Sequence, residues 1–193
     1  MKVQSSDILP EVKIILPDVY SDLRGSFCET YHTARYRDCG IDAVFVQDNL
    51  SRSRKNVLRG LHYQSPHPQG KLVRVVWGEV FDVAVDIRRG SPTFGKWAGH
   101  VLSSENNLQL YIPAGFAHGF VVRSDQALFA YQCTDYYDRS SSRGVRWDDP
   151  DLNISWDVES PILSDHDQTY PSLSDIPYDE LPVYESPTER RGE

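Results

Sequence analysis

The clearest regularity in the chain is a two-residue alternation of apolar side chains in residues 78–87 (GEVFDVAVDI). Phe81 and the aliphatic residues at every second position after it share one face, while Asp82 and Asp86 lie on the other. This period predicts a β-strand. Shorter runs rich in β-branched and aromatic residues occur at 108–113, 116–122 and 128–134, between turn-forming clusters. Many short strands without alternating helices predict an all-β jelly-roll barrel.

Helical patterns are few, and the best one lies in residues 33–40 (TARYRDCG), where Gly40 is placed to end a short helix. A length of 193 residues suits one domain, which we assign to residues 1–170. Residues 171–193 hold four of the twelve prolines and almost no periodic apolar pattern. We therefore expect them to form a C-terminal tail that packs on the domain or frays from it.

The composition excludes several classes of protein. An aromatic content of 11%, with four Trp, is too high for a chain that is disordered throughout, and three Cys are too few for a disulfide scaffold. Cys28, Cys39 and Cys133 have no close partner in the sequence, so we expect reduced thiols in the core. The N-terminus has no signal-peptide pattern and no stretch approaches about 18 apolar residues, which predicts a cytoplasmic protein without membrane contact.

The net charge of −8 conceals an uneven distribution along the chain. Residues 148–193 contain 13 acidic and two basic side chains, whereas residues 52–96 contain nine basic and three acidic ones, a local charge of +6. The overall acidity argues against binding to nucleic acid. The basic middle is typical of a site for a small anion, although an ordinary solvated surface explains the same charges.

Two histidines stand in strand-like segments beside glycine, His62 in LRGLHYQ and His118 in PAGFAHGF. An imidazole accepts a proton at neutral pH when a carboxylate orients its ring, although both residues also fit the role of hydrogen-bonded core histidines. The string PAGFAH matches the second half-motif of cupin barrels. Metal-binding cupins have a second His where Gln64 follows His62 here. We therefore predict no metal site and keep a metal-dependent cupin as an alternative.

Eight segments in order extend this match over about residues 10–170. They are residues 22–29 (DLRGSFCE), 45–49 (FVQDN), 58–64 (LRGLHYQ), 69–74 (QGKLVR), 79–86 (EVFDVAVD), 113–120 (PAGFAHGF), 147–150 (WDDP) and 163–167 (LSDHD). Each segment alone is weakly specific, but eight in register make a chance match a poor explanation. Together they resemble the dTDP-4-dehydrorhamnose 3,5-epimerase family of the cupin superfamily.

This resemblance implies epimerisation at C3 and C5 of dTDP-4-keto-6-deoxyglucose, which gives dTDP-4-dehydro-L-rhamnose without a cofactor. By the same resemblance, His62 is the base that removes a proton and Asp167 is the carboxylate paired with it. Lys71 then meets the developing enolate oxygen, where a preorganised cation stabilises the charge. Tyr131 returns a proton on the opposite face of the sugar, since a neutral phenol is a competent donor.

The resemblance also implies the substrate contacts. The residues that match positions holding the diphosphate and the sugar are Arg24, Gln47, Asn49, Arg59 and His118. Phe27 and Glu29 match the nucleobase contacts, and Tyr137 offers a further aromatic face. In the family, part of the segment from Arg24 to Glu29 comes from a neighbouring subunit. A homodimer with strand exchange near the active site is therefore implied.

Two points of geometry stay open on the sequence alone. Asp82 and Asp86 are alternatives to Asp167 as the carboxylate beside His62. In addition, ideal strand alternation points Arg59 and His62 to opposite faces of one strand. A bulge between these two residues would bring them to the same face.

The chain departs from the family pattern at two candidate ligand contacts. Ser142 stands where members often have an acidic residue, and His166 stands where they often have Lys directly before the paired Asp. These departures bear on the nucleotide and the pose of the sugar.

Three further functions stay open on the sequence: a mono-epimerase acting at C3 or C5 only, a 3,4-ketoisomerase on a related barrel, and a sugar-nucleotide binding module without activity.

Overall fold

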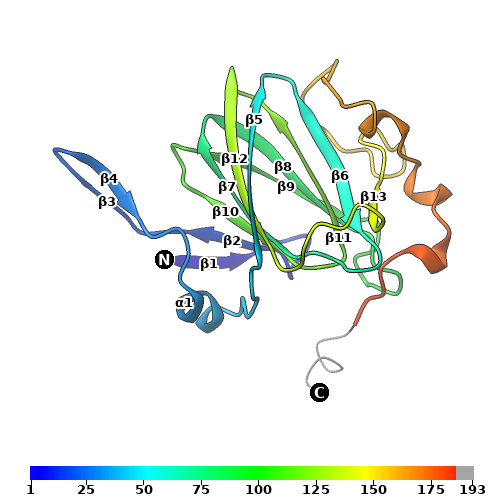
Figure 1. Cartoon of the computed structure of the whole chain (residues 1–193), viewed down its shortest axis with the longest axis horizontal. Coiled ribbons are helices and arrows are strands. Elements are labelled where there is room, and N and C mark those ends of the chain that lie inside the picture. Colours follow the sequence, from blue (N-terminus) through cyan, green and yellow to red (C-terminus); the bar gives the residue numbers. More distant parts are fainter. Residues whose placement is uncertain (186–193) are drawn as a thin grey trace.

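The computed structural model describes residues 1–185, which form a body of β-strands with a hairpin that projects from it (Figure 1). The strands are β1 (Lys2–Ser5), β2 (Lys13–Leu16), β3 (Val19–Asp22), β4 (Gly25–Cys28), β5 (Gln47–Arg54), β6 (Leu58–Gln64), β7 (Lys71–Trp77), β8 (Glu79–Asp86), β9 (Trp97–Ser103), β10 (Gln109–Ile112), β11 (Phe116–Val122), β12 (Gln126–Cys133) and β13 (Ser142–Gly144). The helices are α1 (Thr33–Asp38) and the 3-10 turns η1 (Asp167–Thr169), η2 (Leu173–Asp175) and η3 (Tyr178–Glu180).

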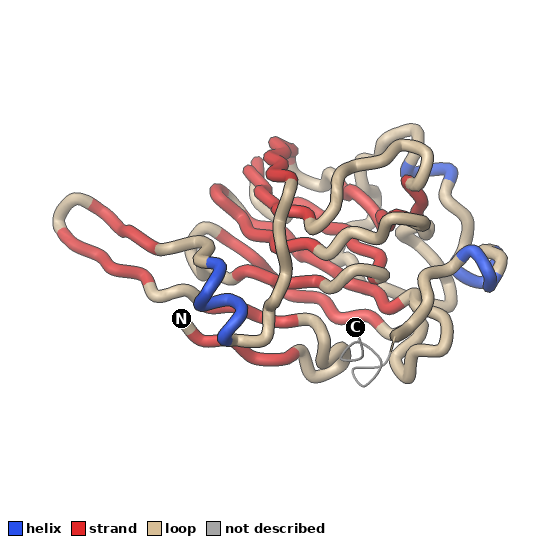
Figure 2. The backbone as a smooth tube through the Cα atoms, turned by 60° about the horizontal axis from the view of Figure 1, so that its bottom comes forward, coloured by secondary structure: helices blue, strands red, loops and turns tan. Residues whose placement is uncertain are grey.

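Strands β5 to β12 are divided between two antiparallel sheets, and the chain changes sheet after every strand except β8, which pairs with β9 in the second sheet. The first sheet has the order β5-β12-β7-β10 and is extended beyond β10 by β2 and β1, while the second has the order β6-β11-β8-β9 with β13 beside β6. Figure 2 shows the two sets of strands as the red layers of the body, with tan loops at both ends. This strand order is that of a jelly roll, so the predicted all-β jelly-roll barrel is confirmed.

The apolar residues of the sequence pattern explain why β8 is an inner strand of the second sheet, between β11 and β9. Its even positions, including Val80 and Ala84, belong to the hydrophobic core between the two sheets. Its odd positions, including Val83 and Val85, pack in a second core on the outer face of the sheet. The residues of this second core that follow β13 in the sequence come from loops and short turns, and the largest of their side chains is that of Trp156. Both faces of the strand are therefore buried.

A bulge in β6 explains how the side chains of Arg59 and His62 come to lie on the same side of the sheet. His62 pairs with His118 on β11 and Arg59 pairs with Phe120, so three steps along β6 match two steps along β11. The extra residue on β6 turns Arg59 and His62 toward the same side of the sheet. Gly60, between them, has a φ of +124°, and a Cβ there would lie 2.6 Å from Cα of Gly119. Only glycine allows the two strands to approach this closely.

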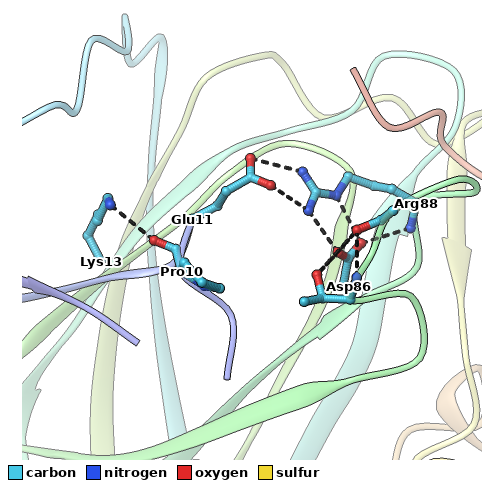
Figure 3. Close-up of polar contacts among 7 residues, drawn as sticks. Pro10, Glu11, Lys13, Asp86 and Arg88 are labelled. Atoms are coloured by element: carbon cyan, nitrogen blue, oxygen red, sulfur yellow. Dashed lines mark hydrogen bonds and ion pairs between the residues drawn. The ribbon is translucent and has the colours of Figure 1, made fainter. Parts of the chain in front are cut away.

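The N-terminal segment is fixed to the end of β8 by a buried ion cluster (Figure 3). Arg88, which is 2% exposed, donates to both carboxylate oxygens of Asp86, with N···O distances of 2.9 and 2.8 Å. The same guanidinium donates to both oxygens of Glu11, at 3.1 and 2.8 Å. The charge on each group is thus paired as burial requires.

The remaining elements agree in part with the expectations from sequence. Helix α1 is confirmed, and Gly40 ends it with a φ of +84°. Of the three free cysteines, Cys133 is buried, but Cys39 is exposed and Cys28 is half-buried, so the expectation that all are core thiols is wrong. Cys39 is the C-cap residue of α1, where the chain leaves the helix, and the buried residue of the helix is Tyr36.

The C-terminal segment lies against the outer face of the second sheet as far as the structure describes it. Leu173 and Leu181 are buried in the second core, between short 3-10 turns. The end of the expected tail, residues 186–193, lies outside the described residues, and the domain boundary at residue 170 stays a prediction. None of the helices in residues 1–185 has the length and apolar character that a membrane crossing requires.

We expect the substitution Gly60→Ala to destabilise the protein by on the order of 3 kcal/mol, because the new methyl group meets the backbone of β11 and the backbone conformation disfavours any side chain. Gly90→Ala is the matched control. Gly90 also has a positive φ, +82°, but a Cβ there has no neighbour within 4 Å in the described residues, so the expected cost is about 1 kcal/mol. Urea denaturation measures both values, and equal losses for the two variants would contradict the role given to the close approach.

Candidate active site

A cleft of about 280 Å³ opens where β6, β7 and β12 face the loops after β12 and before η1. Its lining is rich in groups that bind anions or transfer protons. The lining residues are Arg59, His62, Tyr63, Gln64, Gln69, Lys71, Tyr131, Tyr137, Ser142, Ser164, His166, Asp167 and Tyr170. The four residues proposed from sequence as catalytic, His62, Lys71, Tyr131 and Asp167, thus line one cleft.

His62 and Asp167 form a close pair in this cleft. Nε2 of His62 lies 2.6 Å from Oδ1 of Asp167, although the residues are 105 positions apart in the sequence. The imidazole is 41% exposed to the cleft, whereas the carboxylate is 5% exposed beneath it. A carboxylate can only accept, so Nε2–H donates to Asp167 and the other ring nitrogen is free to act as an acceptor.

The surroundings of Asp167 keep it ionised. Burial by itself raises the pKa of this carboxyl group, but the hydrogen bond from His62 and the electrostatic interaction with its ring, followed by Ser164 and His166, lower the pKa below its ordinary value. The backbone N–H of Asp167 donates to Oγ of Ser164 at 3.1 Å, which ties the first residue of η1 to the loop before it. His62 thus binds the carboxylate, and the bond to Ser164 fixes the backbone of the same residue.

Lys71 and Tyr131 lie on neighbouring strands of the first sheet, with side chains directed into the barrel. Burial lowers the pKa of the Lys71 ammonium, and its electrostatic interactions with Cys133 and Asp82 oppose this shift. Burial also raises the pKa of Tyr131, so that the phenol keeps its proton at neutral pH. The cleft thus combines a cation of reduced proton affinity with a neutral acid.

The cleft continues inward as a smaller space of about 130 Å³ between the sheets. Arg59, His62, Lys71 and Tyr131 border both spaces, and the inner one adds Ser51, His118, Phe120 and Phe129. His118 is 7% exposed, and its Nε2 lies 2.8 Å from Oδ2 of the fully buried Asp82. The site therefore contains two histidine–carboxylate pairs, one at its mouth and one at its inner end.

These contacts show which of the three candidate carboxylates, Asp82, Asp86 and Asp167, is the partner of His62. Asp167 makes the hydrogen bond to His62. Asp82 instead pairs with His118, and Asp86 is bound by Arg88 at the other end of β8. Asp82 and Asp86 lie on the same face of one strand in the sequence pattern, but each forms its hydrogen bonds with a different basic residue.

The other expected contacts at the cleft come from β5, β6 and the loop after β12. Arg59 donates through Nε to Oγ of Ser53 at 3.1 Å, which leaves the end of its guanidinium for a ligand. Gln47 donates to Asn49 Oδ1 at 3.0 Å and accepts the backbone N–H of Tyr137 at 2.9 Å. Gln47 therefore holds the loop that presents the Tyr137 ring, while Gln47 and Asn49 do not themselves line the cleft.

Three expected contacts lie away from the cleft, on or beside the projecting hairpin of β3 and β4 (Figure 1). Arg24 stands in the hairpin turn with its side chain 91% exposed and paired with Asp22. Phe27 is 70% exposed on β4, and Glu29 binds Arg35 of α1 at 2.7 Å. A single copy of the chain therefore does not bring these three residues to the His62 cleft.

The structure adds residues that the sequence reasoning missed. The ring of Tyr170 packs edge-on against His62, with centroids 5.8 Å apart, and against His166 at 4.9 Å. Gly144 leaves room for it, since a Cβ there would lie 2.4 Å from the Tyr170 ring. No pattern around Tyr170 indicated this position. Ser164 was detectable, because Ser-x-x-Asp is a helix-start signature.

The two departures from the family pattern both fall in the cleft. Ser142 and His166 line it beside Asp167. Gln64, which stands where metal-binding cupins have a histidine, donates to the His67 carbonyl at 2.8 Å and accepts the Asp138 N–H at 2.9 Å. Its amide thus joins two loops at the cleft wall. Among residues 1–185, no group of three or more His, Cys, Asp or Glu side chains is arranged to hold a metal ion.

Comparison with known proteins gives consistent matches over most of the chain. A family model described as dTDP-4-dehydrorhamnose 3,5-epimerase matches residues 7–175. A protein of that name from Shigella flexneri is 52% identical over 172 residues, which cover 88% of this chain and 95% of the relative. One from Neisseria gonorrhoeae is 54% identical over 160 residues, or 82% of this chain, but the chain spans only 49% of that relative's length.

A solved structure is similar along nearly its entire length. It is the crystal structure of dTDP-6-deoxy-D-glucose-3,5-epimerase from Legionella pneumophila Philadelphia 1 in complex with dTDP-4-keto-L-rhamnose. The two chains are 51% identical and superpose with a TM-score of 0.93, and the match covers 96% of this chain and 99% of that one. Fold and sequence therefore point to the same family.

The lowered pKa of Asp167 gives a testable pH dependence. Because this pKa is lower in the folded protein, the carboxylate stabilises the fold above the ordinary Asp range near pH 4, and this contribution is lost as the pH falls through the folded value. We expect Asp167→Asn to be less stable than the wild type by on the order of 1 kcal/mol at neutral pH, a value reduced by the exposure of His62. The difference should shrink below about pH 4 in urea denaturation.

The control for this measurement is Asp165→Asn, which changes an exposed carboxylate in the same loop. A stability difference for Asp167→Asn that is independent of pH, or one matched by Asp165→Asn, would contradict the assignment of the lowered pKa to the His62 contact.

Proposed function

The chain belongs to the dTDP-4-dehydrorhamnose 3,5-epimerase family, and we propose that it is an isomerase that inverts C3 and C5 of dTDP-4-keto-6-deoxyglucose to give dTDP-4-dehydro-L-rhamnose. The observation that carries this proposal is the His62–Asp167 pair at 2.6 Å in the same cleft as Lys71 and Tyr131. A base, a cation and a neutral acid around one space are the three groups that such an inversion requires.

The chemistry follows from the ketone at C4. Its electron withdrawal acidifies the hydrogens at C3 and C5, so that a base removes one of them and leaves an enolate with its charge on O4. Inversion then needs a proton delivered to the opposite face of the same carbon. Each centre is inverted by one removal and one delivery, and no electrons leave the substrate.

We assign the base to His62, which accepts the substrate proton on its free ring nitrogen. Asp167 supports this role, because a buried ionised carboxylate holds the ring orientation and stabilises the imidazolium that forms. Lys71 stabilises the enolate oxygen, and the low dielectric around its buried ammonium strengthens that interaction. Tyr131 delivers the proton to the opposite face, which its retained phenol proton supports.

We assign the binding of the sugar nucleotide to a ring of polar and aromatic residues around the mouth. Arg59 suits a diphosphate oxygen, because a guanidinium offers paired donors to phosphate. Tyr137, 60% exposed beside the cleft, offers its ring to the nucleobase. Gln47 and Asn49 support the loop that carries Tyr137 and contact the sugar or the phosphates. His118 contacts the sugar from the inner space.

We further propose a homodimer in which the β3–β4 hairpin of each subunit completes the site of the other. The exposed side chains of this hairpin support it: Leu23 and Phe27 are apolar, and within the described part of the chain the two strands pair only with each other. In this arrangement, Arg24, Phe27 and Glu29 meet the nucleotide bound to the partner subunit. Leu50 and Trp77, each 66% exposed on the first sheet, suit the remaining contact surface.

The test of the reaction is incubation of the protein with dTDP-4-keto-6-deoxyglucose in D₂O, followed by NMR of the sugar. We expect deuterium at both C3 and C5 together with inverted configuration. Absence of label at both carbons would refute the epimerase assignment. Label at one carbon only would identify a mono-epimerase, and a ketone moved to C3 would identify a ketoisomerase.

Two variants separate the proposed base from the proposed acid. His62→Ala should abolish both exchange and turnover, with a loss of at least about 10²-fold, because no other group takes up the proton. Tyr131→Phe should lose inversion while keeping part of the exchange, since proton removal precedes delivery. A Tyr131→Phe protein as active as the wild type would contradict the role of Tyr131. If His62→Ala changed only the affinity for dTDP, the protein would be a binding module without activity.

Strand exchange is tested by complementation between two inactive variants, Arg24→Ala and His62→Ala. In a mixed dimer, the body with an intact His62 receives the intact hairpin of its partner, so one of the two sites is complete. Co-expression in equal amounts should therefore restore about a quarter of the wild-type activity. No recovery from dimers shown to be mixed would mean that each subunit uses its own hairpin.

A further inference from the structure

The inner end of the site holds a buried carboxylate with one oxygen unaccounted for. Asp82, on β8, is fully buried between the sheets, and its Oδ2 accepts the hydrogen bond from His118. Its Oδ1 is also buried and has no hydrogen-bond partner among residues 1–185. An ionised carboxylate loses several hydrogen bonds to water on burial, so an oxygen without a donor is costly.

The register of the second sheet places a matching donor opposite this oxygen. His100 on β9 is the direct cross-strand partner of Asp82. Directly paired residues of antiparallel strands carry their side chains on the same face, with Cβ atoms about 5 Å apart. Nε2 of His100 is buried and likewise lacks a hydrogen-bond partner in the described part of the chain. An orphaned acceptor and an orphaned donor thus share one face of adjacent strands.

The charges around this pair come from several elements. Burial lowers the pKa of His100, and the carboxylates of Asp82 and then of Asp7, in the N-terminal segment, oppose that effect. From β7, the ammonium of Lys71 interacts with Asp82. On β11, His118 makes its hydrogen bond to the same carboxylate. Asp82 is therefore the common neighbour of three basic groups, of which His118 and Lys71 border the inner space of the site.

We propose that His100 is a positioning residue of the active site, whose Nε2–H donates to Asp82 Oδ1 directly or through one bridging water and thereby fixes the Asp82–His118 pair. The three residues then form a continuous polar line across the adjacent strands β9, β8 and β11. His100 itself does not border the cleft or its inner space.

The consequence for His118 is a fixed proton arrangement. With donors to both of its oxygens, the Asp82 carboxylate is fixed in place and accepts the Nε2–H of His118. The other ring nitrogen of His118 is then an acceptor at the inner end of the site. The role of His118 toward the sugar rests on the proposed function, whereas the arrangement of protons is a property of the protein alone.

The direct test uses ¹⁵N-labelled protein without substrate and follows the imidazole nitrogens of His118 by NMR. In the wild type we expect His118 to carry its proton on Nε2. In His100→Leu, which removes the donor but keeps an apolar side chain of similar bulk, this signature should be lost or broadened. His100→Gln should restore it, because the amide of Gln can donate to the same oxygen. An unchanged His118 spectrum in His100→Leu would overturn the proposal.

Kinetics provide the second readout. We expect His100→Leu to lower kcat by roughly tenfold with little change in KM, since a hydrogen bond to a charged group is lost at a distance from the ligand. His100→Gln should recover most of the loss. His32→Leu, at the exposed start of α1, is the matched control for a His-to-Leu change and should behave as the wild type. A Gln variant no better than the Leu variant would mean that His100 only fills space.

Two further outcomes distinguish a failure of this proposal from a variant that does not fold and from a failure of the proposed reaction. If His100→Leu does not fold, the wild type decides: a slowly exchanging Nε2–H on His100 supports the bridge, and a ring protonated on Nδ1 alone overturns it. If the wild-type protein incorporates deuterium at neither C3 nor C5 of the sugar, the proposed reaction is refuted. The NMR measurement on His100, Asp82 and His118 still tests the present proposal, because it needs no substrate.

Discussion

The close approach of β6 and β11 is the contact on which the site depends. It requires glycine on both strands, because a Cβ at Gly60 meets Gly119 and a Cβ at Gly119 meets the carbonyl of Arg59 at 2.8 Å. The bulge formed there changes the facing of one strand within three residues. Without it, Arg59 and His62 would lie on opposite faces of the sheet, and no single cleft would hold both.

The interior of the barrel is divided between an apolar core and a polar end. Residues such as Val80, Leu110 and Phe129 fill the core between the sheets, whereas Lys71, Asp82 and His118 lie at the end nearest the cleft. Burial makes each of these three groups costly unless it has a partner. The barrel meets this requirement by placing His118 beside Asp82 on the adjacent strand β11, while the Lys71 ammonium interacts with the same carboxylate from the first sheet.

The site also depends on segments outside the barrel strands. Asp167 begins the short turn η1, and the loops around it are anchored because Trp156 and Leu173 are buried on the outer face of the second sheet. A carboxylate at the far end of the chain is thereby held under a histidine of β6. The projecting hairpin shows the opposite case, since nothing in residues 1–185 covers its exposed apolar side chains.

The sequence by itself determined the strands and the short helix α1, because the apolar period is a local property of the chain, and its resemblance to a known family predicted that His62, Lys71, Tyr131 and Asp167 share one site. Tertiary structure alone decided which of three carboxylates meets His62, how β6 turns Arg59 and His62 together, and that Tyr170 and His100 lie near the site. Those outcomes depend on contacts between strands far apart in sequence, where a shift of one residue in register exchanges the faces of a strand.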